Sequence, residues 1–320
     1  KVTADNLNVT GSIDYKGHRL MGYPAQRVTS NFNYLNNKIN INNLQASLFN
    51  IPISGEASAV LKNNNLDSVN IKLDGGAANL DGFIKDLTGK VSAFKVNIQG
   101  NINSLNGVIN FNAPQVAYQG YKVNNIAMQL KLANSANANL NGKFNYEGAQ
   151  GYLQGSVANL LNKPKLNLTA KLVDFDIKRA ASMIPDASQY KLDGKVTAAL
   201  NITGSASKPN ISGNITSPAL AAAGNNLSKL DVNFAFADNA LNITKGTGNL
   251  NNSPVNLTGS IRNLNKKNPD IDFNLSSPSF NASEAKINNL SAKITGSLDN
   301  LNANISAANL NASELKLNNL

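Results

Sequence analysis

The side chains that most often carry out chemistry in proteins are scarce in this sequence. Its 320 residues include no cysteine and a single histidine, His18, which lies in a Tyr-Lys-Gly-His-Arg stretch typical of a surface turn. A serine hydrolase triad would have to use His18, and no nucleophile elbow is present. In two pairs of acids, Asp174 with Asp176 and Asp270 with Asp272, one apolar residue separates the acids, as in an alternating β-strand. We therefore expect no enzyme, no catalytic residue, no cofactor and no metal site.

Motifs that bind phosphate, calcium or nucleic acid are also missing. The Asp74-Gly75-Gly76 triplet indicates a turn, and neither glycine-rich phosphate-binding pattern occurs. The net charge is +10, from 29 basic and 19 acidic residues. The lysines stand singly at polar strand positions, for example Lys72, Lys95, Lys131, Lys171 and Lys195. This spacing argues against nucleic acid as a partner. It is typical of a solvated face, or of a face attracted to anionic lipid head groups.

Alternation of apolar and polar residues dominates the chain. Val69-Asn70-Ile71-Lys72-Leu73 is a clear example, and it predicts a strand with one apolar and one wetted face. Six such strands supply the predicted apolar lining: Val69, Ile71, Leu73, Phe94, Val96, Ile98, Leu166, Leu168, Leu172, Val196, Leu200, Ile202, Val232, Phe234, Phe236, Ile271, Phe273 and Leu275. Because little in the sequence can cover this face, the sheet either closes on itself or forms a trough whose lining contacts another molecule. The expected fold class is all-β with a few short helices.

An internal repeat of about 100 residues organises the chain. Gly100 and Gly204, like Pro114 and Pro218, are 104 residues apart, and the apolar pattern 126–132 recurs at 230–236. Stacked repeats predict one continuous elongated array rather than separate domains. The expected repeats are roughly 1–78, 79–174, 175–280 and 281–320.

Two short helices are predicted from apolar spacing at i, i+3, i+4 and i+7. They cover residues 80–87 and 177–184, the second with Asp176 as its N-cap and Pro185 after its end. At the corresponding third position, near 282–286, the helical spacing of apolar residues is largely lost. No stretch approaches the roughly 18 apolar residues of a membrane-spanning helix. No signal peptide is visible, and we expect the chain to be a segment of a longer protein.

The second repeat carries a motif that resembles a known family. Leu192-Asp-Gly194-Lys-Val196 is followed by Gly204, and then by Lys208-Pro209-Asn-Ile211-Ser-Gly213-Asn-Ile215. This succession of glycines, a proline and alternating apolar residues after a short helix resembles repeats of the AsmA-like superfamily, in particular its TamB-type proteins of diderm bacteria.

The resemblance implies both a fold and a function. The fold would be a long, twisted β-sheet with a U-shaped cross-section and an apolar inner groove. The protein would be a conduit that crosses the periplasm and moves glycerophospholipids between inner and outer membrane, supporting outer-membrane biogenesis. Its partners would be phospholipid acyl chains and an Omp85-type outer-membrane barrel. It would be anchored in the inner membrane through a segment outside this sequence.

The principal alternative is a closed β-solenoid, as in adhesins and other surface proteins rich in Asn, Ser, Thr and Gly. The rungs of such solenoids are much shorter than 100 residues. An outer-membrane barrel would need aromatic girdles, but aromatic residues make up only 6% of the chain.

Overall fold

Antiparallel β-strands account for almost all of the computed structural model, in which one helix is present among the described residues. These are residues 7–20, 23–48, 50–81, 85–160, 162–181, 191–282, 285–297, 299–312 and 315–318. The chain divides into two compact units. Unit 1 is Lys1–Tyr146 with Tyr152–Leu166, and unit 2 is Glu147–Gly151 with Asn167–Leu320.

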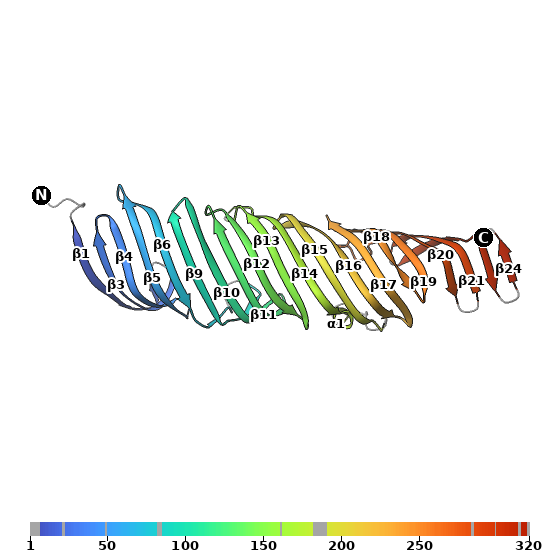
Figure 1. Cartoon of the computed structure of the whole chain (residues 1–320), viewed down its shortest axis with the longest axis horizontal. Coiled ribbons are helices and arrows are strands. Elements are labelled where there is room, and N and C mark those ends of the chain that lie inside the picture. The colour runs from blue at the N-terminus through green and yellow to red at the C-terminus, as the bar shows by residue number, and fades with distance from the viewer. Residues whose placement is uncertain are drawn as a thin grey trace. The chain divides into compact units, whose positions relative to one another are not determined.

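Unit 1 is an antiparallel meander in which neighbours along the chain pair side by side (Figure 1). After β6, the chain forms two short strands and then returns, so that β9 pairs with β6. The short strand β8 pairs with β10, and β7 pairs with β8. The strands are β1 (Asn8–Lys16), β2 (Arg19–Leu20), β3 (Tyr23–Leu35), β4 (Lys38–Leu48), β5 (Ile51–Lys62), β6 (Asn65–Gly75), β7 (Ala78–Asn79), β8 (Leu87–Val91), β9 (Ala93–Asn101), β10 (Ser104–Tyr118), β11 (Tyr121–Ala133), β12 (Asn137–Tyr146) and β13 (Ala149–Ala158), the last of which begins in unit 2.

Unit 2 is a second antiparallel meander, from β15 to β21, with β22 and β23 both pairing with β21. Its elements are β14 (Lys165–Asp176), α1 (Ile177–Ala181), β15 (Asp193–Ser205), β16 (Lys208–Ala222), β17 (Asn225–Ala237), β18 (Ala240–Leu250), β19 (Ser253–Arg262), β20 (Asp270–Ala282), β21 (Ala285–Ser297), β22 (Asn300–Ser306), β23 (Asn309–Ala312) and β24 (Leu315–Asn318). Within the described part of either unit, the first and last strands do not pair with each other. The predicted all-β class is confirmed, and each sheet is open.

Asparagine supplies many of the hairpin turns. Left-handed backbone angles occur at Asn36 and Asn37, at Asn63 and Asn64, and at the Asp238-Asn239 turn. Two consecutive left-handed residues form the tight hairpin whose twist matches that of paired strands, and asparagine tolerates this conformation better than most residues. Left-handed turns therefore explain a part of the high asparagine content.

A proline that lies opposite a left-handed residue of the next strand recurs at corresponding places. Ala113 pairs with Ile126 and Gln115 with Asn124, so Pro114 lies opposite Asn125, whose φ is 51°. Pro218 lies in the same way opposite Lys229 (φ 53°), and Pro278 opposite Asn289 (φ 52°). Proline donates no ladder hydrogen bond, and the left-handed residue opposite bends the neighbouring strand.

The strands themselves repeat with the period found in the sequence. β16 and β17 begin and end 104 residues after β10 and β11, and β19 begins and ends 104 residues after β13. The 104-residue spacing of Pro114 and Pro218 thus marks equivalent positions in two copies of the same strand.

One of the two predicted helices is wrong in its described part. In the 80–87 segment, Asp86 has a left-handed φ of 64° and Leu87 begins β8, opposite Tyr118. Asp81 accepts a hydrogen bond from the backbone amide of Gly89, which stabilises a turn. Residues 82–84 lie outside the described part.

The other predicted helix begins where expected, as α1. The Asp176 carboxylate accepts a hydrogen bond from the Lys178 amide at 3.0 Å, which confirms Asp176 as its cap. Residues 182–184 of this prediction lie outside the described part, and the third position near 282–286 is strand where described. None of the described helices is long and apolar enough to span a bilayer.

Candidate apolar binding face

In unit 1, apolar residues of successive strands lie directly opposite one another. The predicted lining residues Ile71 and Leu73 of β6 face Ile98 and Val96 of β9. One row crosses eight strands without a polar side chain: Phe32, Ile41, Ala57, Ile71, Ile98, Gly107, Leu132 and Ala138. We call the side of each sheet that carries these rows the apolar face.

In unit 2, the predicted lining residues of β15, β17 and β20 belong to comparable rows. The intermediate strands supply the missing members, which the sequence reading did not select. One row comprises Ile202, Ile211, Phe236, Leu241, Ile261 and Ile271, and the next comprises Leu200, Gly213, Phe234, Ile243, Gly259 and Phe273. Val232 pairs with Ile215, and Leu275 pairs with Leu257.

The remaining predicted lining residues lie on β14, on β15 and at the ends of the β6–β9 pairing. Leu166, Leu168 and Leu172 alternate with polar residues along β14, and Leu168 is buried. Val196 lies in β15 beside a register shift between Gly194 and Thr197. Val69 pairs with Gly100, and Phe94 pairs with Gly75 and with Phe111.

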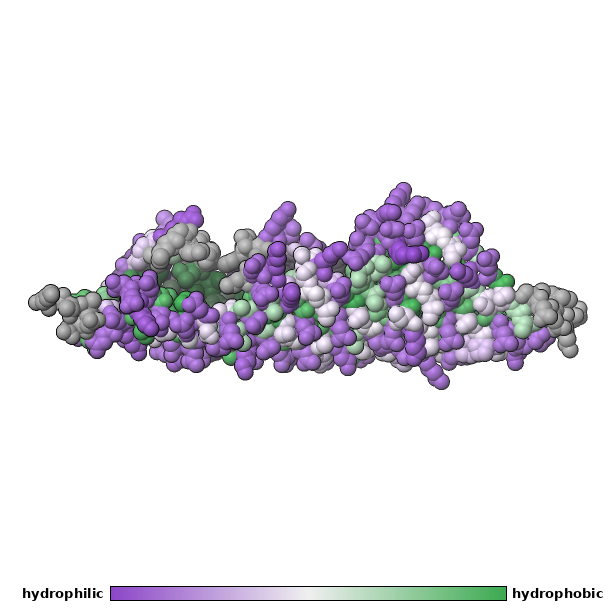
Figure 2. Space-filling model, turned by 90° about the horizontal axis from the view of Figure 1, so that it is seen from above, coloured by the Kyte–Doolittle hydropathy of each residue, from purple (hydrophilic) through white to green (hydrophobic). Residues whose placement is uncertain are grey.

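The apolar face is only partly covered. Apart from Leu168, all of the predicted lining residues are half-buried. The buried apolar residues of the described chain are mostly alanines, such as Ala25, Ala113 and Ala149. Figure 2 shows hydrophobic residues of unit 1 inside a hollow bordered by hydrophilic ones. A second protein layer packed on this face would bury its large side chains fully, as in an ordinary core.

Large side chains on the apolar face lie over glycines of the next strand. A Cβ added to Gly75 would overlap the Phe94 ring, and one added to Gly213 would come within 2.9 Å of Leu200 Cδ2 and overlap the Ala199 carbonyl oxygen. Cross-strand pairs of one large and one absent side chain keep the rows continuous while the backbones approach closely.

The opposite side, which we call the polar face, carries amides and isolated ion pairs. Lys72 pairs with Glu56 at 2.9 Å, and Lys95 pairs with Asp74 at 2.9 Å. These pairs are exposed and contribute little to stability. The five lysines singled out in the sequence are all exposed. The polar face is therefore the solvated face that the alternation predicted.

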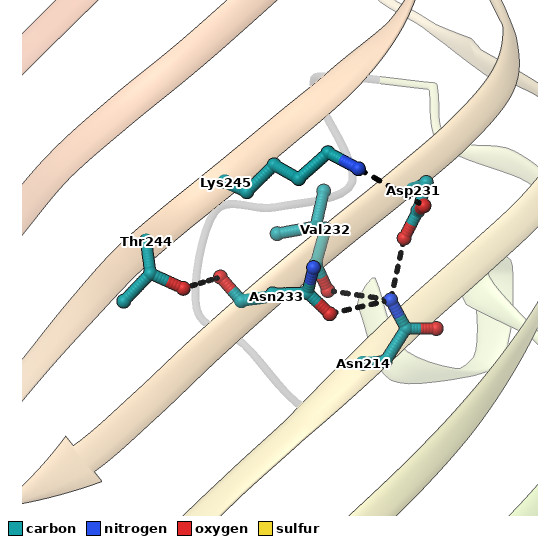
Figure 3. A network of polar contacts seen from close by, with 6 residues as sticks. All are labelled: Asn214, Asp231, Val232, Asn233, Thr244 and Lys245. Atoms are coloured by element: carbon teal, nitrogen blue, oxygen red, sulfur yellow. Dashed lines mark hydrogen bonds and ion pairs between the residues drawn. The ribbon is translucent and has the colours of Figure 1, made fainter.

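A denser polar network lies on the polar face of unit 2 (Figure 3). The side-chain nitrogen of Asn214 donates to Asp231 Oδ1 at 2.5 Å and to Asn233 Oδ1 at 2.9 Å. Lys245 Nζ is 4.0 Å from the second oxygen of Asp231, and the Thr244 hydroxyl donates to the Asn233 carbonyl at 3.3 Å. These contacts join β16, β17 and β18 edge to edge.

The residues considered for catalysis are exposed or take part in structural hydrogen bonds. His18 is exposed, and its carbonyl accepts a hydrogen bond from the Ala25 amide. Asp176 caps α1, and Asp270 accepts a hydrogen bond from Asn263 at 2.6 Å. Among the residues that the structure describes, no three acids, histidines or cysteines gather where they could hold a metal ion.

Comparisons with known proteins do not assign the chain to a family. No family model, no curated protein sequence and no solved structure matches it. The geometry of the two faces is therefore the basis on which a function can be inferred.

Proposed function

We propose that this chain is part of a lipid-transport conduit of the AsmA-like, TamB type, in which glycerophospholipid acyl chains move along the apolar face. The observation that carries the proposal is the unbroken apolar row in each unit, most of whose members are only half-buried. Soluble monomers rarely leave so much contiguous apolar surface without a ligand. A lipid tail supplies an apolar surface of matching shape.

The energetics of a row suit transport better than capture. Each methylene that leaves water gains about 0.8 kcal/mol, wherever along the row it lies. Successive strands present similar aliphatic side chains, such as Ile202, Ile211 and Ile261, so an acyl chain meets similar contacts at each step. No polar side chain interrupts the row, so no single position would hold the head group or trap the tail.

On this proposal the chain works in the periplasm, anchored in the inner membrane by a segment outside it. It would serve outer-membrane biogenesis together with an Omp85-type barrel. The closed solenoid is less well supported, because each described sheet is an open antiparallel meander rather than a coil of parallel rungs.

The test compares two acidic substitutions on neighbouring residues of β17. Phe234 lies on the apolar face opposite Ile243, and Ala235 lies on the polar face opposite Ser212. We expect lipid to co-purify with the wild type, detected by mass spectrometry, and to photocrosslink to a probe at position 243. Phe234→Asp should abolish the crosslink while circular dichroism stays unchanged, because a carboxylate on an open wall still reaches water. Ala235→Asp should leave it intact.

The proposal fails if the wild type carries no lipid and gives no crosslink. It also fails if Phe234→Asp unfolds the sheet, because a buried unpaired charge costs several kcal/mol only in a closed core.

A further inference from the structure

A second hollow lies on the polar face of unit 1 and has a volume of about 640 Å³. It spans β3, β4, β5 and β6. The strand register places its polar members in two adjacent rows, Thr29–Gln45–Ser54–Asp74 and Arg27–Ser47–Pro52. The residues between these rows, Ala46, Ile53 and Gly75, also line the hollow, although the alternation along each strand assigns them to the apolar face.

The hollow is kept open by glycine. Gly76 follows β6, and its amide donates to the Pro52 carbonyl at 2.9 Å, which holds the backbone against β5. A Cβ at Gly76 would come within 2.8 Å of Pro52 Cγ. Any larger residue at this position would narrow the hollow.

The polar groups that line the hollow are mainly hydrogen-bond donors. Arg27 is exposed, and no acidic side chain of the described chain lies within salt-bridge distance of it. The carboxylate of the lining, Asp74, is already paired with Lys95 at 2.9 Å. The hydroxyls of Thr29, Ser47 and Ser54 have no hydrogen-bond partner among the described residues. The local charge of Arg27, Lys95 and Asp74 is therefore positive.

This combination suits an oxyanion. Arg27 and Ser47 are direct cross-strand partners, so their Cβ atoms are about 5 Å apart and both side chains reach one small ligand. A guanidinium binds two phosphate oxygens with parallel N–H groups, and hydroxyl donors satisfy the remaining ones. The hollow is larger than one phosphate group, which leaves room for an organic substituent.

We propose that this hollow binds a phosphate group, with Arg27 as the bidentate donor and Ser47 and Ser54 as supporting donors. The phosphate group comes from a free phosphate ion or from a phosphorylated glycerol such as a lipid head group. The three proposed donors, Arg27, Ser47 and Ser54, occupy polar-face positions of the register.

The experiment is calorimetric titration of the whole chain with inorganic phosphate and, separately, with glycerol 3-phosphate at constant ionic strength. The wild type should show saturable binding of inorganic phosphate. Arg27→Ala should weaken the affinity at least tenfold, as the loss of a charge-assisted hydrogen-bond pair requires. Arg27→Lys should fall between them, because it keeps the charge and loses the fork. Lys131→Ala removes one exposed charge from the polar face elsewhere in unit 1, and it should change the affinity less than twofold.

Each outcome decides something. Binding of both ligands assigns the site to an organic phosphate, and binding of inorganic phosphate alone assigns it to the free ion. Absence of saturation in the wild type overturns the proposal. Equal losses in Arg27→Ala and Lys131→Ala also overturn it, because they would show attraction to net charge rather than a site.

Discussion

The β10–β11 hairpin of unit 1 and its copy in unit 2, β16–β17, share an apolar face but differ in the charge of their polar face. On the apolar face, Ile109 pairs with Leu130 in unit 1, and the equivalent pair in unit 2 is Gly213 with Phe234. One side chain has become larger where its partner has disappeared, and the pair changes from eight side-chain carbon atoms to seven. The individual residue is free to change as long as the row stays apolar and filled.

The polar face of the same hairpins follows a different rule. Asn110 accepts a hydrogen bond from Gln129 at 3.0 Å in unit 1, and Asn214 bonds to Asn233 at the equivalent place in unit 2. The charged members Asp231 and Lys245 occur only in unit 2, where unit 1 has Ala127 and Asn141. Charge is gained or lost there without a change of strand boundaries. The repeat thus preserves the apolar rows and the strands, which is what a transport surface requires.

The largest expected effect tests the close approach of Gly213 to β15. Gly213→Val should destabilise unit 2 by roughly 3 kcal/mol or more, because the added Cβ overlaps the Ala199 carbonyl, a backbone atom that cannot turn away. Ile109→Val, at the equivalent position of unit 1, should cost only about 1 kcal/mol. Urea unfolding of both variants measures the difference. Equal losses would show that the space between Gly213 and β15 can open to accept a side chain.

Much of this fold follows from alternation, which identifies the apolar face of each strand. Alternation does not identify which strands pair with each other, because a period of two selects a face of the strand but not its neighbour. The pairing of Ile71 with Ile98 depends on a chain excursion through β7 and β8 that the spacing of apolar residues misrepresented as a helix. That predicted helix begins 97 residues before α1 rather than 104, so it had no counterpart in the repeat.

Only some of the residues of the apolar face could be predicted from the sequence. The lining was chosen from six strands with clear apolar alternation, and β16 and β19, which have Gly213 and Gly259 at apolar-face positions, were not included. The register shows that Gly213 and Gly259 are members of the rows, because Leu200 lies beside Gly213 and Phe273 lies beside Gly259. The phosphate hollow gave no sequence signal, since its donors come from three strands.

A smaller effect is expected at the left-handed residues that lie opposite the prolines. Lys229 and Asn125 hold the same left-handed conformation, but lysine lacks the local hydrogen bonding that helps asparagine adopt it. Lys229→Gly should therefore stabilise unit 2 by about 1 kcal/mol, and Asn125→Gly should stabilise unit 1 by less. Thermal unfolding of the two variants at matched salt measures both changes. A destabilising Lys229→Gly would mean that the lysine side chain contributes packing that outweighs its strain.

The smallest expected effect is a pH dependence of stability that is present in the hairpin of unit 2 and absent from its copy in unit 1. Lys208 Nζ lies 2.6 Å from Asp238 in unit 2, and the equivalent residues of unit 1, Ser104 and Asn134, share a neutral hydrogen bond at 3.3 Å. The hydrogen bond and the charge of Lys208 lower the pKa of Asp238 below 3.8, and those of Asp238 raise the pKa of Lys208 above 10.5. The stabilisation from Asp238 is therefore present at neutral pH and lost as pH falls through its lowered pKa. That from Lys208 is present at neutral pH and lost as pH rises through its raised pKa.

The double variant Lys208→Ser with Asp238→Asn copies the unit 1 pair into unit 2 and removes both titrations. The difference in urea midpoint between wild type and variant should be small and constant through the neutral range, because both side chains are fully exposed. It should shrink below pH 3.8 and above pH 10.5. Ser104→Lys with Asn134→Asp, the reverse exchange in unit 1, should introduce the same dependence. A midpoint difference that does not change between pH 7 and pH 3 would show that the pair is open in solution, and that the hairpin ends of the two copies are equivalent.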